Sequence, residues 1–197
     1  MTAVRRPNQQ DVVAYWQLIC GIPSPQNPMI DANGESALRG QDPPKDLVYL
    51  SGSTGANRIR NIPQNIPSGR DIFIAVNPVV VTEPEAGTNN TADLKKFAKD
   101  DADSATLARL TINGQLHDLI PNNRVGTGPF DVVFPDNAIF HAPKGTFPAV
   151  ADGYYAIIAG LPPGNNKIDI DAEVSNPFKK FNEPVSWKDK VSYNFKI

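Results

Sequence analysis

The clearest pattern along this chain is a strict alternation of apolar and polar residues towards its C-terminal end. The segment VSYNFKI (191–197) alternates at every position, and KIDIDAEV (167–174) begins in the same way. Because side chains on a strand point alternately to its two faces, this pattern predicts strands with one buried and one solvated face. Another strand is predicted at 154–159, with a Pro-Pro-Gly turn at 162–164 after it. Asn113-Gly114 lies between two alternating runs and predicts a β-hairpin.

Further strands are predicted upstream from short apolar segments bounded by turn residues. They are DLVYLSGS (46–53), GPFDVVFP (128–135) and NAIF (137–140). The longer run GRDIFIAVNPVVV (69–81) is apolar almost throughout, which indicates a strand that is covered on both faces. Pro78 lacks a backbone N–H, so a bulge, a bend or a sheet edge is expected near it.

Two segments have helical periodicity instead. In NQQDVVAYWQLIC (8–20), apolar residues recur every three or four positions after Asn8, which can cap the helix. TADLKKFAKDDADSA (91–105) has a narrow apolar face among charged residues, with Thr91 as its predicted N-cap. Both helices are expected at the periphery of the fold.

The composition supports a strand-rich fold. The chain has 197 residues, of which 40% are hydrophobic and 20% charged, with 14 Gly and 19 Pro. So many turn-forming residues favour short strands over long helices. We predict an all-β protein, an antiparallel β-sandwich of jelly-roll or immunoglobulin-like type with two short peripheral helices, as a single domain over 1–197.

Charge and cysteine content narrow the classes of function. Acidic and basic residues are interleaved and the net charge is −2, so a nucleic acid is not expected as a partner. No apolar run approaches the length of a membrane-spanning helix, and the polar segment 1–10 has no signal-peptide core. One cysteine and two histidines exclude an internal disulfide, a cysteine-based zinc site and a histidine-rich metal centre.

Three segments carry motifs that are familiar as a set. Segment 15–53 has a Trp-bearing helix followed by a Pro-rich loop and a Gly-Gln pair, and segment 66–85 has a Pro-x-Gly strand that reaches an Asn. Segment 151–170 has a late Asp-Gly-Tyr/Pro-Gly hairpin. Together they resemble an uncharacterised family of bacterial, mostly exported β-sandwich proteins, over roughly residues 14–172. The resemblance implies a sandwich fold and a secreted or cell-surface location, and it carries no catalytic residues with it. The chain departs from the family in its single Cys20 and in Asn166, where members often have His.

One candidate metal site is built from oxygen ligands. AVNPVVVTEPEAG (75–87) contains Asn77 and then Glu83 and Glu85, which would share a face if the strand continued through them. Together with Asp31 in the sequence DANGE, they are the kind of ligands that Ca²⁺ prefers. The glutamates could equally be an acid–base pair or the solvated end of a strand, and Asp31 could belong to a plain Asn-Gly turn. No cofactor other than Ca²⁺ is suggested, and no catalytic residue is assigned.

Three functions remain open at this stage. The first is a non-catalytic binding or structural module at or outside the bacterial cell surface. Its contact surfaces would be the long loop 23–45 and the two glutamates, and it would self-associate through 191–197 as an edge strand.

The second is a metal-assisted hydrolase that uses Asn77, Glu83, Glu85 and Asp152, which requires these side chains to converge. The third is a carbohydrate-binding module, which requires exposed aromatic side chains in a flat row. A carbohydrate or another protein is therefore the expected kind of partner.

Overall fold

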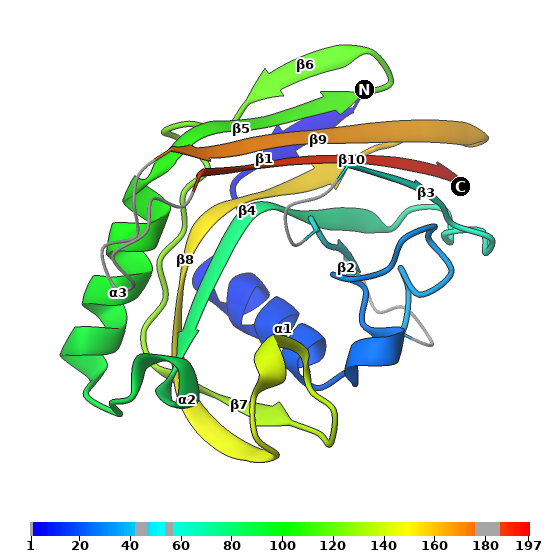
Figure 1. Cartoon of the computed structure of the whole chain (residues 1–197). Coiled ribbons are helices and arrows are strands. Elements are labelled where there is room, and N and C mark those ends of the chain that lie inside the picture. Colours follow the sequence, from blue (N-terminus) through cyan, green and yellow to red (C-terminus); the bar gives the residue numbers. More distant parts are fainter. Residues whose placement is uncertain (1, 42–46, 54–56, 176–185) are drawn as a thin grey trace.

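Strands predominate in the computed structural model, which describes residues 2–41, 47–53, 57–175 and 186–197 (Figure 1). They form two five-stranded sheets, and the first has the order β1-β8-β4-β2 with β7 also paired to β8. Its strands are β1 (Ala3–Arg5), β2 (Leu47–Leu50), β4 (Asp71–Thr82), β7 (Phe130–Phe134) and β8 (Gly145–Ala159). The second sheet has the order β3-β10-β9-β5-β6. Its strands are β3 (Asn57–Asn61), β5 (Ala105–Ile112), β6 (Gln115–Asp118), β9 (Asn165–Ser175) and β10 (Ser186–Lys196).

Both sheets are mixed, so the prediction of purely antiparallel pairing is wrong. β2 runs parallel to β4, and β3 runs parallel to β10, whereas the other pairs are antiparallel. The chain passes from β2 in the first sheet to β3 in the second and then returns to β4. Two neighbouring parallel strands need such a crossover connection, and no local sequence pattern predicts it.

Three α-helices lie within the described residues, one more than predicted. They are α1 (Gln9–Cys20), α2 (Glu83–Ala86) and α3 (Thr91–Asp103), and there are short 3₁₀ turns η1 (Ser24–Gln26) and η2 (Ile139–His141). Asn8 caps α1 as predicted, in a reciprocal capping box with Asp11. Asn90 caps α3, so Thr91 is the first helical residue and not the cap.

β4 has a buried face on each side, as its continuous apolar run predicted. Ile72, Ile74 and Val76 face the second sheet and belong to the core that the two sheets share. Phe73 and Ala75 face α1, where the Phe73 ring stacks on Tyr15 at a centroid distance of 5.2 Å. Further along, β4 and β8 extend beyond the second sheet, and α3 covers them there (Figure 1).

A β-bulge between Ala75 and Asn77 bends β4 at the point where it leaves the second sheet. This is the irregularity expected near Pro78. The partner strand approaches very closely here, because a Cβ added to Gly153 on β8 would lie 2.4 Å from the carbonyl oxygen of Asn77. Gly153 has a φ of 142°, which only glycine adopts readily, so the bulge depends on this glycine.

Two further predictions about strands are wrong. The segment 191–197 is not an edge, because β10 is flanked by β9 on one side and by β3 on the other. NAIF is not a strand either, since Ile139 and Phe140 lie in the 3₁₀ turn η2. The hairpin at Asn113-Gly114 is confirmed, and both residues have the positive φ that its turn requires.

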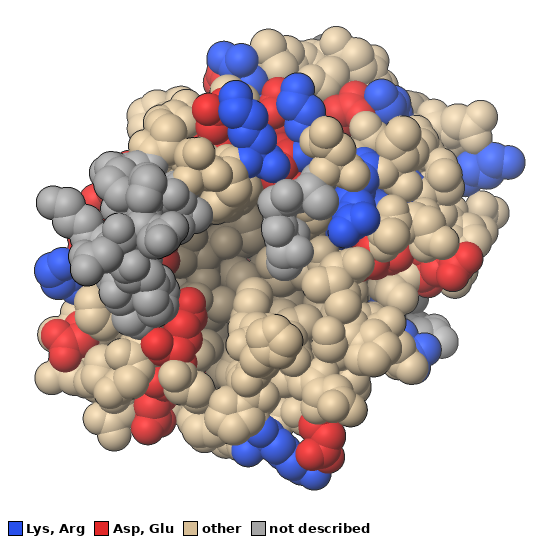
Figure 2. Space-filling model, in the orientation of Figure 1, with Lys and Arg blue, Asp and Glu red and all other residues tan. Residues whose placement is uncertain are grey.

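The outer face of the second sheet is a ladder of opposite charges. Lys188 pairs with Glu173 at 2.9 Å and Lys167 with Asp169 at 2.9 Å. On the face shown in Figure 2, basic and acidic side chains lie next to one another along the upper rim rather than in a field of one sign. No helix within the described ranges combines the length and the apolar character needed to cross a membrane.

We predict that Gly153→Ala lowers the free energy of unfolding by more than about 3 kcal/mol, because strain and a backbone clash act together. Gly87→Ala is the matched control. Gly87 also has a positive φ, of 68°, but no atom lies within 4 Å of its added Cβ, so the expected loss is about 1 kcal/mol. Urea denaturation measures both losses, and equal losses would show that the bulge does not need the close approach.

Candidate functional site

The polar centre of the fold is the guanidinium of Arg60, which is fully buried between the sheets. It donates hydrogen bonds to four carbonyl oxygens and to the Tyr193 hydroxyl. The carbonyls belong to Met29 (3.1 Å), Asp31 (2.8 Å), Ser51 (2.9 Å) and Gly52 (3.1 Å). Arg60 thereby ties β3 to β10, to the end of β2 and to the 29–31 loop.

A buried carboxylate, Asp189, balances this charge through one peptide group. Asp189 lies on β10 with 1% exposure, and it accepts hydrogen bonds from the backbone N–H of Ser53 (2.7 Å) and from the Ser53 hydroxyl. The Gly52 carbonyl that Arg60 binds and the Ser53 N–H that Asp189 binds belong to the same peptide unit. The dipole of that peptide therefore lies between a buried positive and a buried negative charge, as an interior charge pair requires.

The structure places Asp31 in a turn, which is the plainer of its two predicted roles. Its carboxylate accepts hydrogen bonds from the backbone N–H groups of Asn33 (3.2 Å), Gly34 (3.1 Å) and Ser36 (3.0 Å). The part of the loop 23–45 beyond residue 41 lies outside the described ranges. Within them, the loop holds η1 and this turn, and its carbonyls serve as acceptors for Arg60.

Glu83 and Glu85 do not continue the strand, so the premise that they share a strand face is wrong. They occupy the single turn of α2, where residues two apart point in different directions. Asn77 is separated from Thr82 by five residues of extended chain, or about 16 Å. The predicted set of Asn77, Glu83, Glu85 and Asp31 is therefore not brought together. Among the described residues, no three His, Cys, Asp or Glu side chains gather where they could hold a metal.

Asn77 itself is buried and carries unmet hydrogen-bonding capacity. It is 1% exposed, and neither its side-chain oxygen nor its nitrogen has a partner among the described residues. It pairs with Tyr154 across the sheet, and Val79 pairs with Asp152, so Asn77 and Asp152 share a face as diagonal neighbours. The hydrolase set is thus divided into two parts, with Asn77 and Asp152 on the strands and the two glutamates in α2.

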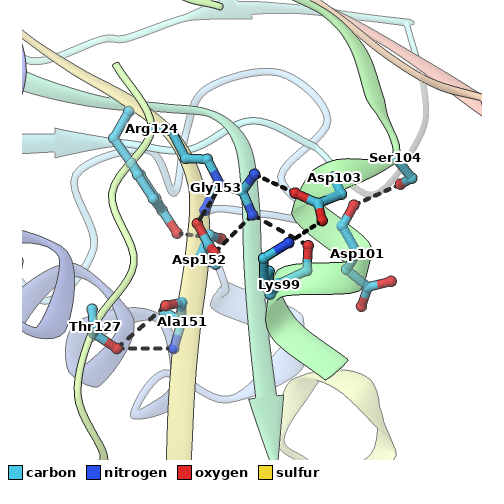
Figure 3. A network of polar contacts seen from close by, with 10 residues as sticks. Lys99, Asp101, Asp103, Ser104, Arg124, Thr127, Ala151, Asp152 and Gly153 are labelled. Atoms are coloured by element: carbon cyan, nitrogen blue, oxygen red, sulfur yellow. Dashed lines mark hydrogen bonds and ion pairs between the residues drawn. The ribbon is translucent and has the colours of Figure 1, made fainter. Parts of the chain in front are cut away.

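Asp152 belongs to a polar clamp that fixes α3 to β8 (Figure 3). Arg124 donates two hydrogen bonds of 2.9 Å to the Asp152 carboxylate, one from Nε and one from Nη2. It also pairs with Asp103 on α3 and donates to the carbonyl of Lys99 at 3.2 Å. Lys99 in turn pairs with Asp103. Two positive and two negative charges thus neutralise one another in this clamp.

The pKa values in the clamp reflect this pairing. The hydrogen bonds that Asp103 accepts from Lys99 and Arg124 hold the pKa of its carboxyl below the ordinary value of 3.8. The hydrogen bonds to Asp152 and then to Asp103 raise the pKa of Arg124 despite its partial burial. The lowered pKa keeps the Asp103 carboxylate ionised at neutral pH, so Asp103 is not poised to exchange a proton there, as acid–base catalysis needs.

The loop between β7 and β8 has strained backbone geometry at its exposed tip. Phe140 and His141 both have positive φ, of 60° and 53°, and Phe140 is 48% exposed. An L residue with a bulky side chain adopts this conformation rarely, and two in succession are rarer. The sequence does not signal this feature, because NAIF has the composition of a strand and contains no residue typical of a left-handed turn apart from Asn137.

Most of the large aromatic side chains are buried. Trp16, Tyr154 and Tyr155 are at most 6% exposed, and the Trp16 indole donates to the Tyr155 hydroxyl at 3.1 Å. Phe140 is the one strongly exposed aromatic in the described part of the chain. Cys20 is also buried, and its burial raises the pKa of its thiol to about 12, consistent with a small hydrophobic core residue.

Comparison with family models, with curated proteins and with solved structures gives no match for this chain. No relative therefore lends it a function or a ligand. The buried charge pair, the clamp and the β7–β8 loop are the observations from which a function can be inferred.

The lowered pKa of Asp103 predicts a pH-dependent contribution to stability. A carboxylate with a depressed folded-state pKa stabilises the fold above its unfolded-state pKa, and this stabilisation is lost as the pH falls through the folded value. Asp103→Asn should therefore unfold more easily than the parent at pH 7, and the difference should shrink as the pH falls below about 4. Denaturation curves across pH measure this.

The control for this comparison is Asp131→Asn on β7. Asp131 is exposed, and its carboxylate has no hydrogen bond or ion pair to the described residues. This variant should change the unfolding free energy little at either pH. A difference for Asp103→Asn that stays constant down to pH 3 would show that its charge does not stabilise the clamp.

Proposed function

We propose that this protein is a non-catalytic β-sandwich binding module that acts at or outside the bacterial cell surface, and that it contacts its partner through the β7–β8 loop. The proposed location rests on the resemblance described for the sequence alone. The contact surface follows from the strained and exposed Phe140 and His141. The single observation that carries the proposal is that the exposed Phe140 has a left-handed backbone conformation, which is unfavourable for a bulky L residue.

The strain has a cost that the fold could avoid. Left-handed geometry costs an L residue roughly 1–2 kcal/mol, and a glycine at either position would remove that cost. Strained conformations of this kind cluster at binding and catalytic sites, because they aim a side chain where a partner needs it. Here the side chain aimed outward is a phenylalanine, and aromatic rings are frequent anchors of binding surfaces.

The loop is fixed at its base, so Phe140 is presented by a rigid support. Ala138 and Ile139 are buried in the core beside α1. The Asn137 carbonyl accepts a hydrogen bond of 2.7 Å from the backbone N–H of Ser24, and Lys144 pairs with Asp136 at 2.7 Å. A preorganised loop loses less conformational entropy on binding than a mobile one, which favours recognition.

The hydrolase alternative has less support. Asn77 and Asp152 are neighbours, but the Asp152 carboxylate is held by Arg124 and by the Gly153 N–H at 2.7 Å. The two glutamates lie about 16 Å or more along the chain from Asn77, well beyond shared ligation of one ion. A binding role requires none of these residues to converge.

The strain can be tested without knowing the partner. Phe140→Gly should be more stable than Phe140→Ala by about 1 kcal/mol or more, because both variants lose the ring and only glycine relieves the backbone. At Leu116 on β6, which is 58% exposed in a strand, the order should be reversed by about 0.5–1 kcal/mol. If alanine is the more stable substitute at both positions, the loop is not strained and the proposal loses its basis.

Binding is tested by co-sedimentation of the full chain with purified bacterial cell walls. The parent protein should sediment with the walls, and Phe140→Ala should bind about tenfold more weakly, as expected for an aromatic anchor. Leu116→Ala, which removes an exposed apolar side chain from another surface, should bind like the parent. A parent that stays in solution, or a Phe140→Ala variant that binds equally well, would contradict the proposal.

A further inference from the structure

A groove of about 560 Å³ lies at the end of the second sheet that holds the C-terminal end of β10. The turn between β5 and β6, the start of β9, the end of β10 and the segment after β3 meet there. Half of the residues that line it are asparagines, and two are lysines. The asparagines are Asn65, Asn113, Asn165, Asn166 and Asn194.

The inner amides of the groove are occupied in holding the fold together. Asn113 donates to the side-chain oxygen of Asn166 at 2.8 Å and accepts from the Lys167 N–H at 2.8 Å. Asn166, which is 3% exposed, donates to the carbonyls of Pro162 (2.9 Å) and Gly164 (3.1 Å). These bonds tie the β5–β6 turn to the turn before β9, so they make the floor of the groove rigid.

The amides at the rim retain unmet hydrogen-bonding capacity. Asn65 and Asn165 are exposed, and their side chains make no hydrogen bond to the described residues. Asn194 donates to Asn61 at 3.0 Å, which leaves its own side-chain oxygen available as an acceptor. The rim therefore offers neutral donors and acceptors beside a fixed inner wall.

The electrostatic character of the groove is close to neutral. Lys167 is paired with Asp169 at 2.9 Å, so Lys196 is the one groove lysine without an ion pair to the described residues. Binding of a polyanion such as a nucleic acid needs several cationic side chains, and the groove offers one that is not in an ion pair to the described residues. Apolar atoms of Ile62, Pro63 and Phe195 also line the groove.

From this combination we infer that the groove is a carbohydrate-binding site, separate from the β7–β8 loop, that binds through amide side chains and not through the flat row of exposed aromatic rings that the sequence analysis required. An amide group has two donor hydrogens and one acceptor oxygen with two lone pairs, and a sugar hydroxyl is likewise both donor and acceptor. Neutral amides beside a small apolar surface therefore match the hydroxyls and the C–H face of a sugar ring. The side chains that contact the sugar are Asn65, Asn165 and Asn194.

The test is a titration of the isotope-labelled full chain with maltose, cellobiose, lactose and diacetylchitobiose, followed by NMR. At least one disaccharide should shift the side-chain amide signals of Asn65, Asn165 and Asn194. Asn65→Ala and Asn165→Ala should each weaken its binding about three- to tenfold, which is the typical effect of losing one or two hydrogen bonds. Asn166→Ala is unsuitable, because it would disrupt the turn.

The matched control is Asn89→Ala, which removes an exposed amide near α3 and should leave the affinity unchanged. No shift with any of the four sugars, or equal affinity of the Asn165→Ala and Asn89→Ala variants, would overturn the inference. Shifts at Phe140 and His141 in place of the groove would also overturn it, while supporting the β7–β8 loop as the binding surface. Because the loop proposal has its own stability test, the failure of one can be told from the failure of the other.

Discussion

The structure depends on a guanidinium group that is removed from water at the junction of four segments. Arg60 donates to carbonyls from the 29–31 loop and from the end of β2, and to the hydroxyl of Tyr193 on β10. A buried charge with so many neutral acceptors is tolerable because Asp189 lies one peptide unit away. The preceding peptide, whose Ser51 carbonyl Arg60 also binds, lies next to β4, where its Gly52 N–H donates to the carbonyl of Ala75 at 3.0 Å. The charge pair thus fixes the relative position of the two sheets where β4 begins to bend.

The polar groups of this fold divide into those that stabilise it and those that are left free for a partner. Arg124 and Lys99 neutralise the carboxylates of Asp103 and Asp152, and these ion pairs attach α3 to the sheet. The inner asparagines of the C-terminal groove satisfy one another in the same way. Among the described residues, the exposed ring of Phe140 and the rim amides of the groove are the groups on which the two binding proposals rest.

Local patterns predicted the local elements well. Strict alternation identified β9 and β10, helical periodicity identified α1 and α3, and Asn113-Gly114 identified its hairpin, because each depends on neighbours in the sequence. β1 (AVR) and β3 (NRIRN) were missed, since each is short and neither contains a run of apolar residues or lies beside a turn signal such as Asn-Gly. Missing β3 meant missing Arg60, whose importance comes from residues about 30 positions before it and about 130 positions after it. The mixed pairing of the sheets is non-local in the same sense.

The candidate site was predicted less well, and the reasons are physical. Glu83 and Glu85 were placed on a strand, but Pro84 and the acidic residues around it suit the first turn of a helix, and α2 begins at Glu83. Two roles were left open for Asp31, a ligand of Ca²⁺ and a residue of a plain turn, and the turn is the one observed. Phe140 could not have been found, because backbone strain is imposed by the anchoring of Ile139 and by the β7–β8 register, and neither is written in the local composition.

A double-mutant cycle on Arg60 and Asp189 tests the central claim most directly. Arg60→Met and Asp189→Asn should each lower the unfolding free energy by about 3–5 kcal/mol, because each leaves the other charge buried and uncompensated. The double variant should lose less than the sum of the two by at least about 1 kcal/mol, since the two charges act through one peptide. Losses that add within about 0.5 kcal/mol would show that the two charges are independent, and the account of the buried pair would then be wrong.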